Sequence, residues 1–372
     1  MSSTVYYKSL DGFRALAVLM VVMIHSQWLP FGWVGVQMFF VLSGFLITGI
    51  LVASNGQKFP DYIGYFYWKR GLRIWPLFFL FLALTAISYR TVGLPLGFSA
   101  CWPTLVTYTY NFLRIWKQYD SNWFGHFWTL CLEEQFYLVW PFIVYFLSMG
   151  NLRRLVVTLI VMGPLVRLLT GMAFASIFSD PYDIQIAVNN MTTSQMDAFA
   201  CGALLAILPS HLRDRLASRS GTILLVLAAI TILCGLLNSW VLARHHLPPH
   251  WLALGYDSMC YLHQYVWGYT LLNLTSAGLI LCLLDDRLFS SFFRHPVMIY
   301  IGTISYGVYV WHLPLLSVLF SYWPVEAHTF LGLLRFALLL ASSLAVASVS
   351  YFGFEWFFLR LKGRTGRKAQ AA

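Results

Sequence analysis

The amino-acid sequence predicts an all-α integral membrane protein, a bundle of about ten transmembrane helices. Of its 372 residues, 59% are hydrophobic and only 10% are charged, which leaves too little polar surface to cover a soluble globule of this size. Long apolar runs recur along the chain, and about 20 residues suffice for one helix to cross the hydrocarbon. Tryptophan and tyrosine gather at the edges of these runs, as is typical of side chains in the headgroup region.

Ten apolar runs have lengths near that of a membrane span. The run at 195–209 is short, and the run at 328–358 is long enough to tilt or to project into water. A further run, 101–113, is too short to cross, so we expect a re-entrant or interfacial element there. The ten expected spans lie near residues 14–30, 34–53, 74–92, 125–148, 155–175, 195–209, 221–241, 263–285, 297–320 and 328–358.

The basic residues indicate the orientation of the chain in the membrane. With the amino terminus inside, eighteen of the 24 lysines and arginines fall in cytoplasmic segments and only four in outer loops. This asymmetry predicts that both termini are cytoplasmic. We expect one membrane domain, residues 1–359, followed by a basic cytoplasmic tail, residues 360–372, and a bacterial cytoplasmic (inner) membrane location.

The net charge of +10 would suggest a nucleic-acid partner in a soluble protein. Here the basic residues flank apolar spans, so membrane orientation and membrane lipid explain them and no nucleic acid is expected. The six cysteines are scattered without a close pair, so neither a metal site nor a disulfide framework is predicted.

Ionisable residues inside the predicted spans are the most informative positions, because each costs roughly 2.5 to 3.5 kcal/mol to insert. The first helix carries Asp11, Arg14 and His25. Arg14 and His25 lie within about 20° of one helix face and about 16 Å apart along the axis. Imidazole titrates near neutrality, so His25 is a candidate general base. The alternative is a core histidine bonded to a neighbouring helix.

The next two helices offer a packing motif and a candidate phosphate site. Ser43 and Gly44 would allow another backbone to approach closely, so packing is as good an interpretation as function. Arg70 and Arg73 lie on one face at the cytoplasmic start of the third predicted span. Guanidinium groups suit phosphates, as in coenzyme A, although ordinary topology signals explain these residues equally well.

Glu133 and Glu134 lie eight or nine residues inside the fourth predicted span. At least one is expected to pair with an inward arginine or histidine, and adjacent residues cannot both face one cavity directly. Arg167 also falls inside a span. Further polar residues within the later spans are Gln195, Asp197, Ser305, Tyr306, Tyr309, His312 and Glu355.

At these residues the sequence resembles the membrane-bound acyltransferase-3 family, the multi-span enzymes that O-acetylate bacterial surface glycans and some secreted metabolites. The resemblance covers nearly the whole chain, and five motifs in the family's order make it specific. The matching segments are 10–15 (Leu-Asp-Gly-Phe-Arg-Ala) with His25, 39–46 (Phe-Phe-Val-Leu-Ser-Gly-Phe-Leu), Arg70 with Arg73, 127–137, and 302–314.

The resemblance implies transfer of an acetyl group from cytoplasmic acetyl-CoA, the acyl-CoA co-substrate, to a hydroxyl of a carbohydrate acceptor. His25 would be the catalytic base or acyl relay, and Arg14, with Asp11 in the same motif, would orient that site. Arg70 and Arg73 would hold the donor's phosphates, and Glu133 or Glu134 would tune the histidine or position the acceptor. Substrate or structural roles are expected for Ser43, Gly44, Ser305, Tyr306, His312 and Glu355.

Two other classes of protein fit parts of the pattern. A multi-span transporter or flippase of a glycan or small polar solute also uses buried histidine, arginine and glutamate, but usually shows repeat symmetry or paired broken helices. A scaffold without catalysis would not require so many buried ionisable groups. The acceptor, the length of the acyl group and the oligomeric state carry no signal in the sequence, including the outer segments 180–190 and 244–256.

Overall fold

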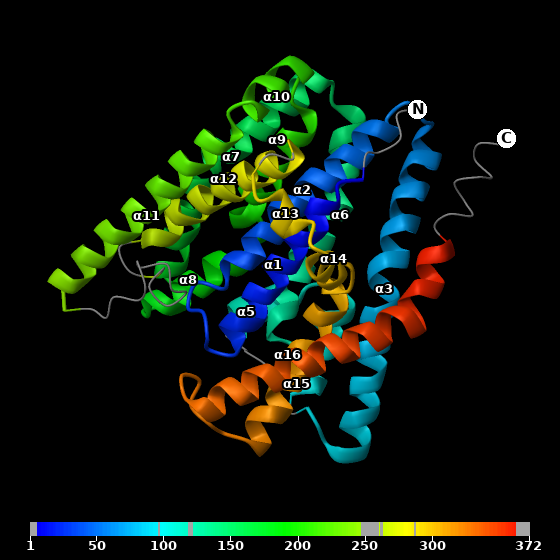
Figure 1. The fold of residues 1–372 in the computed structure, drawn as a ribbon, viewed down its shortest axis with the longest axis vertical. Helices are drawn as coiled ribbons and strands as arrows, with labels where there is room; N and C mark the ends of the chain where they lie inside the picture. Colours follow the sequence, from blue (N-terminus) through cyan, green and yellow to red (C-terminus); the bar gives the residue numbers. More distant parts are fainter. Residues whose placement is uncertain are drawn as a thin grey trace.

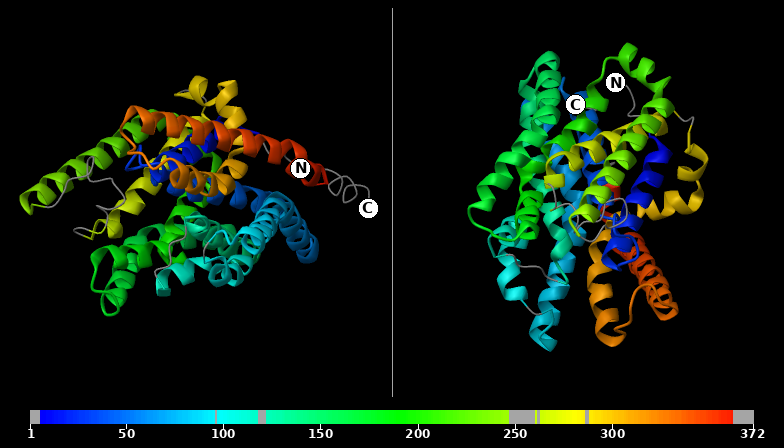
Figure 2. Two further views of the ribbon diagram at one scale, coloured as in Figure 1. Left: turned by 90° about the horizontal axis from the view of Figure 1, so that it is seen from below. Right: turned by 90° about the vertical axis from the view of Figure 1, so that its left-hand side faces the viewer.

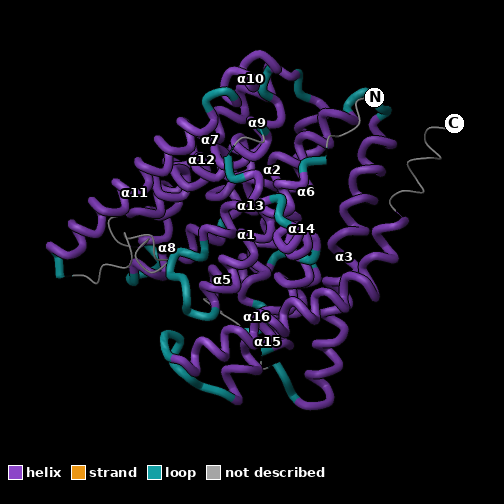
Figure 3. The backbone as a smooth tube through the Cα atoms, in the orientation of Figure 1, coloured by secondary structure: helices purple, strands orange, loops and turns teal. Residues whose placement is uncertain are grey.

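The computed structural model describes residues 6–95, 97–117, 122–246, 260, 263–285 and 288–361. This part of the chain is built from helices joined by short loops and contains no strand (Figure 3). Most of the predicted tail, residues 362–372, and part of the outer segment, residues 247–256, lie outside the described residues. The all-α prediction is confirmed for the described chain.

Groups of long helices are separated along the chain by groups of shorter elements. The long helices are α1 (Lys8–His25), α2 (Val34–Ser54), α3 (Phe59–Val92), α6 (Trp128–Phe146), α7 (Met149–Ala175), α11 (Ser220–Arg244), α12 (Gln264–Leu284), α15 (Ser305–Tyr322) and α16 (Phe330–Ser350). The shorter elements are α4 (Phe98–Val106), α5 (Tyr110–Lys117), η1 (Gly125–Phe127), α8 (Pro181–Asn190), η2 (Thr192–Gln195), α9 (Met196–Ile207), α10 (Ser210–Ala217), α13 (Ser290–Phe293), α14 (Pro296–Thr303) and η5 (Tyr351–Glu355).

Within the described chain, six helices are long and apolar enough to cross a membrane, or seven if the bent pair α14 and α15 forms one span. The chain is therefore a multi-pass membrane protein. These helices account for six or seven of the ten expected spans. With the bent pair counted as one span, three runs remain, and each contains a helix that is shorter or more polar: α1, α6 and α9. With 12 residues, α9 rises only about 18 Å and cannot cross the hydrocarbon alone.

Two elements differ from the sequence-based expectation, and a third agrees with it. The helix α3 begins at Phe59, with Pro60 in its first turn, so Arg70 and Arg73 lie well inside a 34-residue helix and not at its start. The expected span at 297–320 is broken between α14 and α15, which meet at 70°. The run at 101–113 forms parts of the two short helices α4 and α5, in keeping with an element that does not span.

The helices α1 and α2 run through the middle of the molecule, with α11 at one edge and α3 at the other (Figure 1). Seen from below, α1 lies between α16 on one side and α3 and α7 on the other (Figure 2). The side chains that α1 and α2 direct inward therefore meet residues from α3, α6 and α15. This central position brings distant motifs together.

Glycine allows the backbones around these central helices to touch. A Cβ atom on Gly44 of α2 would overlap the carbonyl oxygen of Phe199 in α9, and one on Gly202 would overlap the carbonyl oxygen of Val41. The two helices thus approach through a reciprocal pair of small residues, as is common in membranes. In the same way, Gly302 of α14 lies directly against the backbone of α1 at Asp11.

We predict that Gly44→Ala destabilises the protein by about 1–3 kcal/mol, because the added methyl group must push α2 and α9 apart. Thermal unfolding in detergent measures the effect. Gly49→Ala in the same helix is the matched control, since nothing lies within 4 Å of its Cβ position. Equal melting temperatures for the two variants would show that the α2–α9 contact tolerates separation.

Candidate active site

A cavity opens between the central helices and the helices around them. It encloses about 880 Å³ of empty space, including its open mouth. Its lining residues come from α1, α2, α3, α6 and α15, so it forms only when elements from both halves of the chain pack together. Its polar lining residues are Arg14, Ser43, Arg70, Arg73, Thr129, Glu133, Tyr137, Ser305, Tyr306 and Tyr309.

Three guanidinium groups line this one cavity. Arg14 donates to Asp11 at 2.5 Å, one helical turn earlier, and Asp11 also accepts from the Tyr6 hydroxyl. Arg70 lies 5.4 Å from the centre of the Tyr137 ring. Neither Arg70 nor Arg73 forms an ion pair with any acidic residue in the described part of the chain. The cavity therefore presents positive charge suited to an anionic group.

Among the lining residues, one carboxylate shares the cavity with the three arginines. Glu133 lines the cavity and accepts hydrogen bonds from Ser43 at 2.8 Å and from the Tyr137 hydroxyl at 3.1 Å. Its neighbour Glu134 is not a lining residue and accepts from the indole of Trp75 at 3.3 Å. Successive residues on a helix point about 100° apart, so the two carboxylates have separate surroundings.

The α15 helix closes one wall of the cavity through three hydroxyl groups. Tyr306 donates to the carbonyl of Ile74 at 2.8 Å, which ties α15 to α3 beside Arg73. The hydroxyl of Tyr309 lies 2.8 Å from that of Thr129. Ser305 also lines the cavity, but its hydroxyl donates to the carbonyl oxygen of Gly302, three residues earlier in the chain.

Three histidines form a cluster beyond the inner end of the cavity. His25 Nδ1 lies 3.0 Å from His312 Nε2, and their ring centres are 5.1 Å apart. The ring of His126 packs edge-on against His312, with centres 5.0 Å apart. His126 was not among the sequence-based candidates. In the sequence, only its position just before the motif at 127–137 marks His126 as a candidate. Its contact with α15 joins two distant elements and cannot be predicted from helical spacing.

The cavity ends about one helical turn from this cluster. Its lining includes Val21, four residues before His25 on α1, and Tyr309, three residues before His312 on α15. Four residues of helix correspond to a rise of about 6 Å. A linear group that enters from the arginines would therefore point its far end toward His25.

Some sequence-based candidates lie outside the cavity. Gly44 packs against α9, and Asp11 lies behind Arg14 as its ion-pair partner. Glu355 is buried in η5 and accepts from Ser350 at 3.0 Å. These positions point to supporting roles for the three residues. No group of three or more histidine, cysteine or acidic side chains placed to hold a metal ion occurs among the described residues.

Comparison with known proteins gives the family. A family model described as an acyltransferase domain matches residues 7–352. The chain belongs to this acyltransferase family. The peptidoglycan O-acetyltransferase OatA of Listeria monocytogenes is 26% identical over 93% of this chain and 54% of its own length. The O-acetyltransferase OatA of Staphylococcus aureus is 25% identical over 87% of this chain and 53% of its own length.

The matched relatives are longer than this acyltransferase chain. A putative O-acetyltransferase of Staphylococcus aureus is 24% identical over 86% of this chain and 52% of its own length. The chain thus spans about half the length of the curated relatives it matches. No solved structure matches it.

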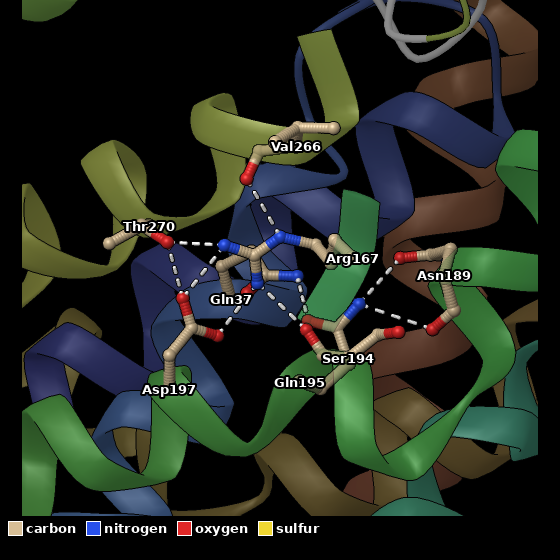
Figure 4. Close-up of polar contacts among 8 residues, drawn as sticks. All are labelled: Gln37, Arg167, Asn189, Ser194, Gln195, Asp197, Val266 and Thr270. Atoms are coloured by element: carbon tan, nitrogen blue, oxygen red, sulfur yellow. Dashed lines mark hydrogen bonds and ion pairs between the residues drawn. The ribbon is translucent and has the colours of Figure 1, made fainter. Parts of the chain in front are cut away.

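A second polar cluster of the acyltransferase surrounds Arg167 of α7, which is fully buried (Figure 4). Its guanidinium donates to both carboxylate oxygens of Asp197 on α9, at 2.9 and 3.0 Å. It also donates to the carbonyls of Val266 and Ser194, and to the hydroxyl of Thr270. Each nitrogen of the guanidinium has a partner, so this cluster holds α7, α9 and α12 together and has no free donor for a ligand.

The cluster continues toward α2 through side-chain amides (Figure 4). Gln37 donates to Gln195 at 3.0 Å, and Gln195 donates to the side chain and backbone of Asn189. The polar residues Gln195 and Asp197 therefore have structural partners.

We predict that Arg167→Met costs about 3–5 kcal/mol of stability, because it leaves the Asp197 carboxylate buried without its partner. The double variant Arg167→Met with Asp197→Leu should recover part of this loss, since it removes both charges. Thermal unfolding of both variants in detergent measures the difference. A double variant no more stable than the single one would contradict the ion-pair explanation.

Proposed function

We propose that the chain is an O-acetyltransferase that moves an acetyl group from cytoplasmic acetyl-CoA to a hydroxyl of a carbohydrate acceptor. The observation that carries the proposal is the arginine-lined cavity that ends one helical turn from the histidine cluster. Family membership and the names of the relatives support the same reaction class.

The donor's phosphates would occupy the arginine end of the cavity. Coenzyme A carries several phosphate groups at one end of a long linear arm and the thioester at the other. Arg14, Arg70 and Arg73 supply charge-assisted donors for the first end. Glu133, held by Ser43 and Tyr137, lowers the net positive charge of the cavity.

The thioester would then lie at the end of the cavity nearest His25. His25 takes the proton from the acceptor hydroxyl as its oxygen attacks the carbonyl carbon. A carbon–oxygen bond forms, the carbon–sulfur bond breaks, and the proton on His25 passes to the departing thiolate. The products are the acetyl ester and free coenzyme A, so the step needs no further reactant.

The membrane placement follows from the same scheme. Cytoplasmic acetyl-CoA requires the arginine end of the cavity to face the cytoplasm, which agrees with the excess of basic residues expected there. Both termini, with the basic tail at 360–372, are then cytoplasmic, and the long helices thread a bacterial inner membrane. A polysaccharide or lipo-oligosaccharide acceptor would meet His25 from the outer half. One relative is named for peptidoglycan, which places this glycan among the acceptors to test.

We predict that His25→Ala abolishes acetyl transfer while the protein stays folded in the membrane, because the proton acceptor is lost. Membrane vesicles that carry the chain are supplied with radiolabelled acetyl-CoA and a crude extract of surface glycans, and alkali-labile label in the glycan is counted. His211→Ala, at an exposed position on α10, is the matched control. Full transfer by the His25 variant would remove this residue from the mechanism.

We predict that Arg70→Gln and Arg73→Gln each raise the KM for acetyl-CoA by ~10- to 100-fold, the loss of one charge-assisted hydrogen bond. Acetyl-pantetheine lacks the nucleotide phosphates, so its KM should not change. Arg215→Gln, at an exposed position on α10, is the control. If the variants raise the KM for both donors equally, or for neither donor, the phosphates do not bind at Arg70 and Arg73.

A further inference from the structure

The three histidines of the cluster are not equivalent. His25 ends α1 and is partly exposed, whereas His312 is fully buried in α15. We propose that His312 is a positioning residue that holds His25 as the tautomer with a proton on Nδ1, which leaves Nε2 as the atom that takes the acceptor's proton. The chemical consequence rests on the proposed function, but the tautomer itself is a property of the resting protein.

The hydrogen bonds of His312 determine where its own proton lies. Its Nδ1 is 2.7 Å from the carbonyl oxygen of Tyr309 and 3.2 Å from that of Val308. A carbonyl oxygen only accepts hydrogen bonds, so Nδ1 of His312 must carry a proton and donate it. These two carbonyls belong to the preceding turn of α15, so the arrangement is built into the helix.

The other nitrogen of His312 then accepts. The His312 side chain has no exposed surface, and none of its hydrogen-bond partners in the described chain is a carboxylate. A buried imidazolium without an anionic partner is costly, so the ring is neutral and Nε2 holds a lone pair. His25 Nδ1, at 3.0 Å from this lone pair, must be the donor.

One ring nitrogen of His25 then remains available to accept a proton. With Nδ1 protonated, neutral His25 carries a lone pair on Nε2. The His25 ring also bonds to the backbone of Val21, whose carbonyl can only accept and therefore leaves this lone pair unused. His25 is partly exposed. A substrate hydroxyl therefore meets an unoccupied acceptor, as a general base requires.

His126 supports the geometry without competing for the proton. Its ring packs against both His312 and Tyr309, with centres 5.0 and 4.8 Å apart. Both of its ring nitrogens are buried without a partner among the described atoms. It therefore restricts the rotation of the His312 ring by contact alone.

The arrangement assists the reaction in a specific way. When His25 Nε2 takes the hydroxyl proton, the ring becomes an imidazolium and its Nδ1–H bond to His312 becomes charge-assisted. The bond therefore strengthens as charge develops, which stabilises the transition state more than the ground state. His312 itself exchanges no proton with the substrate.

Nitrogen NMR tests the tautomer without any need for activity. The full chain, labelled with ¹⁵N at its 10 histidines, is reconstituted in lipid bilayers, and the His25 signals are identified by their loss in His25→Ala. We expect a protonated Nδ1 and an unprotonated Nε2 for His25. A proton on Nε2 instead, or a doubly protonated His312, would overturn the proposal even if the wild type transfers acetyl groups normally.

Kinetics tests the consequence once wild-type transfer has been measured. His312→Leu removes the acceptor and should lower kcat by ~10- to 100-fold, the usual cost of losing an orienting partner, while the KM for acetyl-CoA stays within about twofold. His312→Gln offers a side-chain oxygen to His25 Nδ1 and should restore most of the rate. His211→Leu is the control. Equal kcat values for His312→Leu and His312→Gln, with unchanged melting temperatures, would reject the positioning role.

Discussion

A charged side chain inside a membrane must be either paired or hydrated, and this constraint divides the buried charged residues of the chain into two groups. Arg167 and Asp197 meet it by complete pairing, with every guanidinium nitrogen bonded. Arg70 and Arg73 meet it by lining an open cavity, which Arg14 also lines while paired with Asp11. The first arrangement fixes helices in place. The second keeps donors available for an anion, and this difference separates the structural cluster from the candidate active site.

The helix α1 connects the two ends of that site. It carries Arg14 in the cavity and His25 in the histidine cluster, about 16 Å apart along one helix. Its position depends on close backbone contacts, such as that of Gly302 with Asp11, which leave no room for a side chain. The distance from phosphate site to base is therefore set by a rigid helix. A donor with a long arm suits this geometry better than a compact solute, which favours an acyltransferase over a transporter.

The sequence predicts those features that follow from the spacing of residues along one helix. The alignment of Arg14 with His25 depends on helical periodicity alone, and the apolar run at 34–53 corresponds to α2 (Val34–Ser54). Contacts between helices cannot be predicted from such spacing. The contact of His126 with His312, the pairing of Arg167 with Asp197 and the tie from Tyr306 to Ile74 all join residues far apart in the chain.

Element ends were also hard to predict, for a physical reason. Hydropathy marks where a helix leaves the apolar phase, but the α3 helix continues through polar residues from Phe59. Composition predicts a full span at α9 and one continuous span across α14 and α15. It cannot reveal a helix end or break whose free backbone groups are satisfied by tertiary hydrogen bonds and packing.

The central claim is that one cavity leads from a phosphate site at the arginines toward a base at His25. Its most direct test is an experimental structure of the chain in a lipid nanodisc with a non-transferable thioether analogue of acetyl-CoA. We predict phosphates bonded to Arg70 and Arg73, and the sulfur end beside His25 Nε2. An analogue bound outside this cavity, or bound with its sulfur end away from His25, would contradict it.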